Sequence, residues 1–349
     1  MQKKPRKLHG GDIYHHPDVI DFSVNTNPLG TPESVKRAVQ ESVAKIEHYP
    51  DVRCEALREA ISRFEQVNME EIFCGNGAAE LFFTAVQAVW PQKALVIAPS
   101  FSEYEEALRS VGAEVEYYYL CEEDNFQIRG DYVDKLSEEI DMIFLCNPNN
   151  PTGQIISPEL MKQIVHRCME NQILLVVDEC FLDFSEEYQE LTAKRYLKEN
   201  PYLIVLKAFT KTFALAGARL GYLFCSNDKL REKIVAAGQP WAVSSLAQAA
   251  GKAALENAGE YLEKTREYVK RERDFLQYGL TCCGYQVYNS HANYLFFFSE
   301  DPDLVKKMRQ EGILIRGCDN YRGLGSGYYR IAVRRHEDNV KLLNAFERI

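Results

Sequence analysis

A lysine flanked by two threonines is the residue of this sequence with the clearest potential for covalent chemistry. Lys211 stands between Thr210 and Thr212, after the apolar segment YLIVLKAF and before the small-residue segment ALAGARLG, which contains Arg219. Burial between apolar segments lowers the pKa of a lysine and frees its amine, so Lys211 is a candidate for Schiff-base formation. A single lysine in such a segment is more often a surface lysine on a loop, so the assignment depends on the other residues.

Three further segments place unusual residues at the ends of apolar runs. In ILLVVDE, Asp178 follows apolar residues, so it is either a buried carboxylate with a cationic partner or a helix cap. In FLCNPNNPTG, Asn150 stands between prolines that force an extended exit from a sheet, although an ordinary turn has the same composition. In CGNGAAELFF, a glycine turn precedes a helix. The backbone of Gly77, Ala78 and Ala79 either binds an anion there or only caps the helix.

Together these four segments describe one cofactor. Ligands of open, mainly parallel sheets bind at the carboxyl ends of the strands. An anion cradle, an asparagine, a buried aspartate and a lysine, in that order, suit pyridoxal 5'-phosphate. Its aldehyde needs an amine, its ring nitrogen needs a carboxylate, and its phosphate needs amides, hydroxyls and an arginine. We therefore expect pyridoxal 5'-phosphate as the cofactor.

Arginines gather near the C-terminus of this acidic chain. Arg316 and Arg330 stand in the apolar segments ILIRGC and YYRIAV, whereas Arg322, Arg334 and Arg335 fit a solvated strand surface. A planar guanidinium binds a carboxylate or a phosphate through two hydrogen bonds. Arg316 and Arg330 therefore suit a substrate with two anionic ends.

The elements that must position these residues alternate along the chain. From about residue 54, amphipathic helical patterns alternate with short apolar runs, which indicates a mainly parallel sheet covered on both faces. After Pro240, a long charged helical segment precedes short strands and a last helix, which predicts a smaller α+β unit. We expect an α/β fold with an arm over 1–35 joining the small domain, a large cofactor-binding domain over 36–240 and a small domain over 241–349.

Composition excludes several classes of protein. The 349 residues are 46% hydrophobic and 26% charged, as in ordinary globular proteins. No run of about 18 uncharged apolar residues occurs, so we expect neither a membrane span nor a signal peptide. A net charge of −10 disfavours nucleic acid and anionic membranes as partners. The ten cysteines lack zinc spacing and CxxC pairs, so we expect reduced thiols, no metal site and a cytoplasmic protein.

The motifs NPNNPTG, DECF and TKTFALAGARLGY resemble, in order, those of the fold-type I pyridoxal-phosphate enzymes of the class I/II aminotransferase superfamily. The resemblance covers essentially the whole chain and implies a mainly parallel seven-stranded sheet in the large domain. It implies that Lys211 binds the cofactor aldehyde, that Asp178 pairs with the ring nitrogen and that Asn150 hydrogen-bonds the ring hydroxyl. The other implied cofactor contacts are Phe101 on the ring, Gly77, Ala78, Ala79, Thr210 and Arg219 at the phosphate, and Tyr49 from the neighbouring subunit of a homodimer.

A narrower resemblance concerns the reaction. The segments HGGDIY, DFSVNTNPLG, PWAVSSLA, ILIRGCDNYRGL and YYRIAVR are similar to those of the threonine-phosphate decarboxylases of cobalamin biosynthesis. That family typically has phenylalanine where this chain has Phe181, whereas histidinol-phosphate aminotransferases usually carry tyrosine there. The resemblance implies decarboxylation of O-phospho-L-threonine to (R)-1-aminopropan-2-yl phosphate. We expect Arg330 at the substrate carboxylate and further substrate contacts from Arg316, Asn150 and the arm residues His9, Gly10, Asn25 and Asn27.

Three other interpretations remain open at this point. A histidinol-phosphate aminotransferase would use the same cofactor and break a different bond. An O-phosphoserine decarboxylase would differ in substrate by one methyl group, which is worth only about 1–3 kcal/mol in a pocket. A non-catalytic module that senses the cofactor is the third, and the complete set of lysine, aspartate, asparagine and arginine argues against it.

Overall fold

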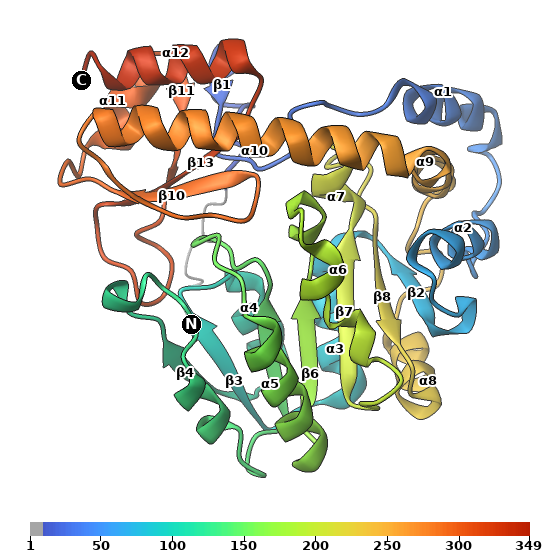
Figure 1. The fold of residues 1–349 in the computed structure, drawn as a ribbon. Coiled ribbons are helices and arrows are strands. Elements are labelled where there is room, and N and C mark those ends of the chain that lie inside the picture. Colours follow the sequence, from blue (N-terminus) through green and yellow to red (C-terminus); the bar gives the residue numbers. More distant parts are fainter. Residues whose placement is uncertain (1–9) are drawn as a thin grey trace, which may run out of the picture.

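A seven-stranded sheet forms the centre of the computed structural model, which describes residues 10–349 (Figure 1). The strand order is β2-β8-β7-β6-β5-β3-β4, and β8 alone runs antiparallel to both of its neighbours. The strands are β2 (Ile72–Gly75), β3 (Lys93–Ala98), β4 (Glu114–Tyr119), β5 (Met142–Cys146), β6 (Leu174–Asp178), β7 (Leu203–Ala208) and β8 (Gly221–Cys225). The expected α/β fold with a mainly parallel seven-stranded sheet is confirmed.

The central strands are apolar throughout because the sheet is covered on both faces. Every residue of β5, β6, β7 and β8 is buried. Successive side chains of a strand point to opposite faces, so Leu175 and Val177 of β6 join one hydrophobic core while Leu174 and Val176 join the other. Each such side chain stabilises the fold by about 1.5–3 kcal/mol relative to an exposed one.

Helices cover the two faces of this sheet. Helices α3, α4 and α8 pack on one face, and α2, α5 and α9 pack on the other. Local signals start several of them: the Ser157 hydroxyl accepts a hydrogen bond from the Leu160 N–H at the start of α5, and Asn227 does the same for α8. The helices of this part are α1 (Glu33–Ser42), α2 (Glu55–Glu65), α3 (Gly77–Val89), α4 (Ser102–Ser110), α5 (Pro158–Glu170), α6 (Tyr188–Leu191), α7 (Phe209–Thr212) and α8 (Asp228–Ala237).

A smaller antiparallel sheet, ordered β12-β13-β10-β9, lies beyond the first one (Figure 1). Its strands are β9 (Gln286–Tyr288), β10 (Tyr294–Phe298), β12 (Arg316–Gly317) and β13 (Tyr328–Ala332), and the nearby helices are α10 (Ala258–Cys282), α11 (Leu304–Gln310) and α12 (His336–Phe346). The N-terminal segment joins this part through β1 (Ile20–Asp21), which pairs in parallel with β11 (Ile313–Leu314).

Two helices link the two parts of the molecule. Helix α9 (Ser245–Glu256) packs against α1 and α2, although it follows Pro240 in sequence. Helix α10 then runs from there to the smaller sheet (Figure 1). None of the helices within residues 10–349 is long and apolar enough to cross a membrane. All ten cysteines belong to these described residues, and all are free thiols.

Candidate active site

A cavity of about 250 Å³ lies where β5, β6 and β7 end, and the smaller sheet closes its other side. Twelve of the sixteen residues predicted for the site line it. From the large part these are Ala78, Ala79, Phe101, Asn150, Asp178, Thr210, Lys211 and Arg219, and from the arm and the smaller sheet Gly10, Asn25, Arg316 and Arg330. The cavity therefore joins segments that lie far apart in the sequence.

The other four predicted residues have different positions. Gly77 is the first residue of α3 and lies against Arg219 rather than on the cavity wall. Tyr49 is 81% exposed and its ring lies tilted against that of Trp241, with 4.9 Å between ring centroids. Asn27 is buried and uses its amide for contacts within the protein, so the structure does not bring its side chain into the cavity. His9 lies outside the described residues.

Lys211 lies on α7, a single helical turn that follows β7 directly. Its Nζ lies 5.8 Å from the centroid of the Phe181 ring, and the structure records no hydrogen bond or ion pair to this nitrogen within residues 10–349. Burial lowers the pKa of Lys211 to about 8, and the positive charges of Arg330 and Arg219 act in the same direction. The amine is therefore a far better nucleophile near neutral pH than an ordinary lysine.

Asp178 ends β6 and presents a buried carboxylate to the same cavity. Its Oδ2 accepts a hydrogen bond from the Tyr104 hydroxyl at 2.6 Å, and its Oδ1 accepts one from the Cys180 N–H at 2.9 Å. Burial raises the pKa of Asp178, while these two hydrogen bonds and the charge of Lys211 oppose the rise. A buried carboxylate held in this way is well placed to pair with a cationic group of a ligand.

Asn150 and Arg330 form a polar part of the cavity wall. The Oδ1 of Asn150 accepts hydrogen bonds from Nη1 of Arg330 and, at 3.3 Å, from the Tyr321 hydroxyl, so its amide nitrogen is directed away from them. Nη2 of Arg330 donates to the Ser23 carbonyl at 2.9 Å. Among the residues that the structure describes, Nε of Arg330 and Oδ1 of Asn25 are buried and have no hydrogen-bond partner. Unsatisfied buried polar atoms are rare, and these two fit a polar ligand in the cavity.

The start of α3 has the features of an anion site. Gly77 has φ +83°, and a Cβ there would lie 2.7 Å from Nη2 of Arg219. The guanidinium thus rests against the first turn of a 13-residue helix, whose free N–H groups and dipole attract negative charge. Ala78, Ala79 and Thr210 complete this corner of the cavity, and the set suits a phosphate group.

Arg316 adds a second guanidinium on the side of the smaller sheet. Its Nη2 donates to Oδ1 of Asn320 at 2.8 Å, and the group lies 5.5 Å from the centroid of the Tyr321 ring. Arg316 and Arg330 are opposite each other in the register of β12 and β13. Two cations on one wall suit a substrate with two anionic groups.

Sequence reasoning missed two tyrosines of the site. Tyr104 and Tyr321 both line the cavity, where they orient Asp178 and Asn150 respectively. Tyr104 follows Phe101 by three residues at the start of a helix, and this spacing could have indicated a shared face. Arg322 is exposed, as its sequence suggests, and it also binds both carboxylate oxygens of Glu105.

Comparison with known proteins places this geometry in a family. Residues 17–349 match the family model for aminotransferase class I and II. The chain is 38% identical to a threonine-phosphate decarboxylase of Salmonella typhimurium, over 98% of this chain and 96% of that protein. It is 33% identical to a histidinol-phosphate aminotransferase of Desulfitobacterium hafniense, over 100% of this chain and 97% of that protein.

Solved structures agree with the sequence comparison. The L-threonine-O-3-phosphate decarboxylase of Porphyromonas gingivalis superimposes with a TM-score of 0.82 at 26% identity, covering 94% of this chain and 98% of that one. The resemblance inferred from the motifs is thereby confirmed at the level of the family. The chain belongs to the aminotransferase class I and II family.

Proposed function

We propose that this chain is a pyridoxal-phosphate-dependent decarboxylase that converts O-phospho-L-threonine to (R)-1-aminopropan-2-yl phosphate and carbon dioxide, as a step of cobalamin biosynthesis. The observation that carries the proposal is the cavity itself, in which a lysine of lowered pKa and a buried aspartate face two arginines. The similarity to threonine-phosphate decarboxylases over nearly the whole chain supports this choice of substrate.

The residues present fit pyridoxal 5'-phosphate. Lys211 would hold its aldehyde carbon, Asp178 its ring nitrogen, and Asn150 its ring hydroxyl through the amide nitrogen that Arg330 and Tyr321 leave free. Phe101 would cover one face of the ring. The first turn of α3 would hold the phosphate, with Gly77, Ala78, Ala79, Thr210 and Arg219. When bound, this cofactor supplies a ring that accepts the electron pair left on the substrate Cα.

The side chains of this chain would then have distinct tasks. Asp178 keeps a proton on the ring nitrogen, because its negative charge is buried beside it. Arg330 binds the substrate carboxylate and fixes its orientation, which decides the bond that breaks. The amine of Lys211 returns a proton to Cα after carbon dioxide has left. Arg316, with Gly10, Asn25 and His9 from the arm, binds the phosphate of the substrate.

The enzyme is further proposed to be a homodimer with shared sites. Apolar side chains that are between 49% and 81% exposed occur close together in the sequence at Val43, Ile46, Tyr49 and Val52, and Trp241 lies beside Tyr49; we call these five residues the dimer patch. Covering such a patch with a second copy of the chain would remove apolar surface from water. Tyr49 would thereby approach the phosphate site of the neighbouring subunit. The ten free cysteines fit a reducing, cytoplasmic environment.

The decisive experiment measures product from O-phospho-L-threonine. Purified protein loaded with pyridoxal 5'-phosphate should release carbon dioxide at the same rate with and without 2-oxoglutarate. Glutamate formation from histidinol phosphate and 2-oxoglutarate, without carbon dioxide release, would show an aminotransferase instead. Faster turnover of O-phosphoserine than of O-phosphothreonine would show that the enzyme is an O-phosphoserine decarboxylase.

A further inference from the structure

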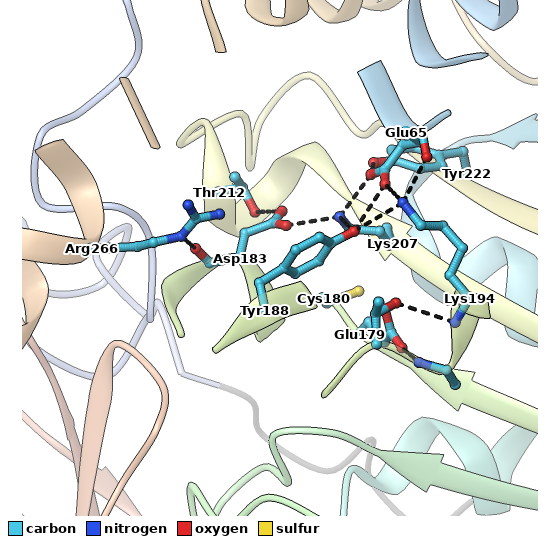
Figure 2. Close-up of polar contacts among 12 residues, drawn as sticks. Glu65, Glu179, Cys180, Asp183, Tyr188, Lys194, Lys207, Thr212, Tyr222 and Arg266 are labelled. Atoms are coloured by element: carbon cyan, nitrogen blue, oxygen red, sulfur yellow. Dashed lines mark hydrogen bonds and ion pairs between the residues drawn. The ribbon is translucent and has the colours of Figure 1, made fainter. Parts of the chain in front are cut away.

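A buried cluster of charged side chains contacts the short segment 207–212, which includes Lys211, and Figure 2 shows its members. At its centre is Lys207 of β7, which is 1% exposed. Its Nζ donates to Oε1 of Glu65 at 2.7 Å and to Oδ1 of Asp183 at 2.8 Å. Lys194 pairs with the other oxygen of Glu65 at 2.7 Å. We call these four residues the charge cluster, and of them none lines the active-site cavity.

The charge cluster is electrically balanced. Burial alone would raise the pKa of Glu65, but the charges of Lys207 and Lys194 outweigh it and lower the pKa to about 2. Glu65 is therefore ionised, and the charge cluster combines two carboxyl groups with two lysine amines. The hydroxyl of Tyr222 adds a hydrogen bond to Glu65 at 2.7 Å. Buried ion pairs often stabilise a fold no better than apolar residues of the same size, so stability alone gives little reason for this arrangement.

Asp183 connects the charge cluster to the neighbour of Lys211. One carboxylate oxygen binds Lys207, and the other accepts a hydrogen bond from the hydroxyl of Thr212 at 2.9 Å (Figure 2). Lys207 lies in β7 and Thr212 ends α7. Asp183 therefore bridges the two ends of the short segment in which Lys211 stands. Its own backbone carbonyl is held by Nε of Arg266 from α10 at 2.9 Å.

Asn27 holds the same turn from the other side. Its backbone N–H donates to the carbonyl of Lys211 at 3.0 Å, and its amide nitrogen donates to the carbonyl of Thr212 at 2.8 Å. The same amide nitrogen reaches the hydroxyl of Thr265 in α10 at 2.9 Å. Asn27, which the sequence suggests as a substrate ligand, thus binds the backbone that carries the lysine.

We propose that Asp183 and Thr212, held by Lys207 and Glu65, are positioning residues that, with Asn27, fix the α7 turn so that the Lys211 amine reaches the cavity. The inference rests on the proposed role of Lys211. A displacement of about 1 Å in a reacting group can cost about a hundredfold in rate. Buried, paired charges resist such a displacement more strongly than apolar packing does, because moving one of them would leave its partner buried without a counter-charge.

Thr212→Val tests this inference, because it removes the hydroxyl at nearly constant volume and leaves every ion pair in place. We expect kcat to fall about tenfold or more while KM changes less than about threefold, as for a group displaced by a fraction of an ångström. The attachment of pyridoxal 5'-phosphate to apoprotein, followed by absorbance, should slow as well. Thr212→Ser keeps the hydroxyl and should restore both rates.

Thr192→Val is the matched control. Thr192 is also buried and also donates to a buried carboxylate, Oε2 of Glu179 at 2.8 Å. Its hydroxyl also accepts a hydrogen bond from the Lys194 N–H at 3.2 Å, and within residues 10–349 no hydrogen bond joins its side chain to α7. It should lower the Tm about as much as Thr212→Val and leave both rates unchanged. If Thr212→Val lowers the Tm without changing either rate, Thr212 is structural only and the inference is wrong.

Two further measurements complete the test. If Thr212→Val does not fold, Thr212→Ala is judged by the same rates and the same control. Borohydride reduction of the wild-type holoenzyme, followed by peptide mapping, separates this inference from the proposed function. A pyridoxyl group on a peptide other than that of Lys211 would refute the proposed function, whereas labelled Lys211 with unchanged rates in Thr212→Val would refute the positioning role alone.

Discussion

At the scale of the residue, the amine of Lys211 is governed by charge and burial. Burial, Arg330 and Arg219 all disfavour its protonated form and lower its pKa to about 8. The neutral amine, which is the reactive form, therefore predominates above about pH 8 instead of above about pH 10.4 as in a free lysine. Because the pKa is lowered on folding, the Lys211 amine binds a proton less tightly in the folded protein than in the unfolded chain.

We predict that the rate of pyridoxal 5'-phosphate attachment to the apoprotein rises with pH and reaches half of its maximum near pH 8. Arg330→Gln removes one positive charge and should move this midpoint upward, although burial, the largest cause, should keep it below the value of a free lysine. Stopped-flow absorbance at a series of pH values measures both midpoints. A wild-type midpoint near pH 10 would show that Lys211 is not held in this environment.

Asp178 gives a second prediction at this scale. Asp178→Asn can still accept the hydrogen bond from Tyr104 but carries no charge. Because the neutral amide cannot stabilise a protonated ring nitrogen, we expect kcat to fall about a hundredfold or more. The variant should still bind cofactor. Tyr104→Phe, which keeps the charge and removes one hydrogen bond, should lose only about tenfold; near-normal turnover by Asp178→Asn would refute the role of the carboxylate.

At the scale of the element, the first turn of α3 is defined by a glycine. Gly77 and Gly112 have the same φ of +83°, but a Cβ at Gly77 would meet Arg219 while one at Gly112 would meet nothing within 4 Å. An alanine in this conformation costs about 1–2 kcal/mol at either position. Both glycines therefore share the backbone strain, but only Gly77 lies against Arg219 at the proposed phosphate site.

We predict that Gly77→Ala weakens pyridoxal 5'-phosphate binding by about ten- to a hundredfold, because the displaced guanidinium loses charge-assisted hydrogen bonds to the phosphate. Gly112→Ala should lower the Tm to a similar extent and leave the affinity unchanged. Equilibrium titration of the apoproteins measures the two affinities. Equal losses of affinity in both variants would mean that strain, and not Arg219, controls the site.

Some of these elements could be predicted from the sequence and others could not. The strands β3 and β5 to β8 were predictable because buried strands are continuous apolar runs, and Lys211 and Asp178 stood out because they follow such runs. An apolar run carries no direction, so the antiparallel course of β8 could not be foreseen. Tyr321 meets Asn150 across 171 positions of sequence, and no local pattern encodes such a contact. The contacts of Asn27 could not be predicted either, because the sequence shows that this residue is polar but not which groups it binds.

At the scale of the whole molecule, the cavity depends on two sheets held together. Arg322 of the segment after β12 binds Glu105 of α4 at 2.9 Å and stacks 4.1 Å from the centroid of the Tyr117 ring. Burial alone would raise the pKa of Glu105, but hydrogen bonds from Arg322 and Arg109 lower it to about 2. The pair therefore stays charged at physiological pH. It joins the segment after β12, the strand of Arg316, to α4 beside the large sheet.

The dimer patch leads to the last prediction. If Tyr49 completes the site of the neighbouring subunit, Lys211→Ala and Tyr49→Ala disable different halves of a shared site. Each homodimer should have little activity. A mixed dimer, isolated by two affinity tags, has one site with both residues intact and one with neither, so it should recover about half of the wild-type activity. Tyr278→Ala, at an aromatic residue that is 74% exposed outside the patch, is the matched control, and its homodimer should remain fully active. A mixed dimer with only the mean activity of its two parents would show that each subunit works with its own residues, and a monomeric mass by light scattering would remove the shared site altogether.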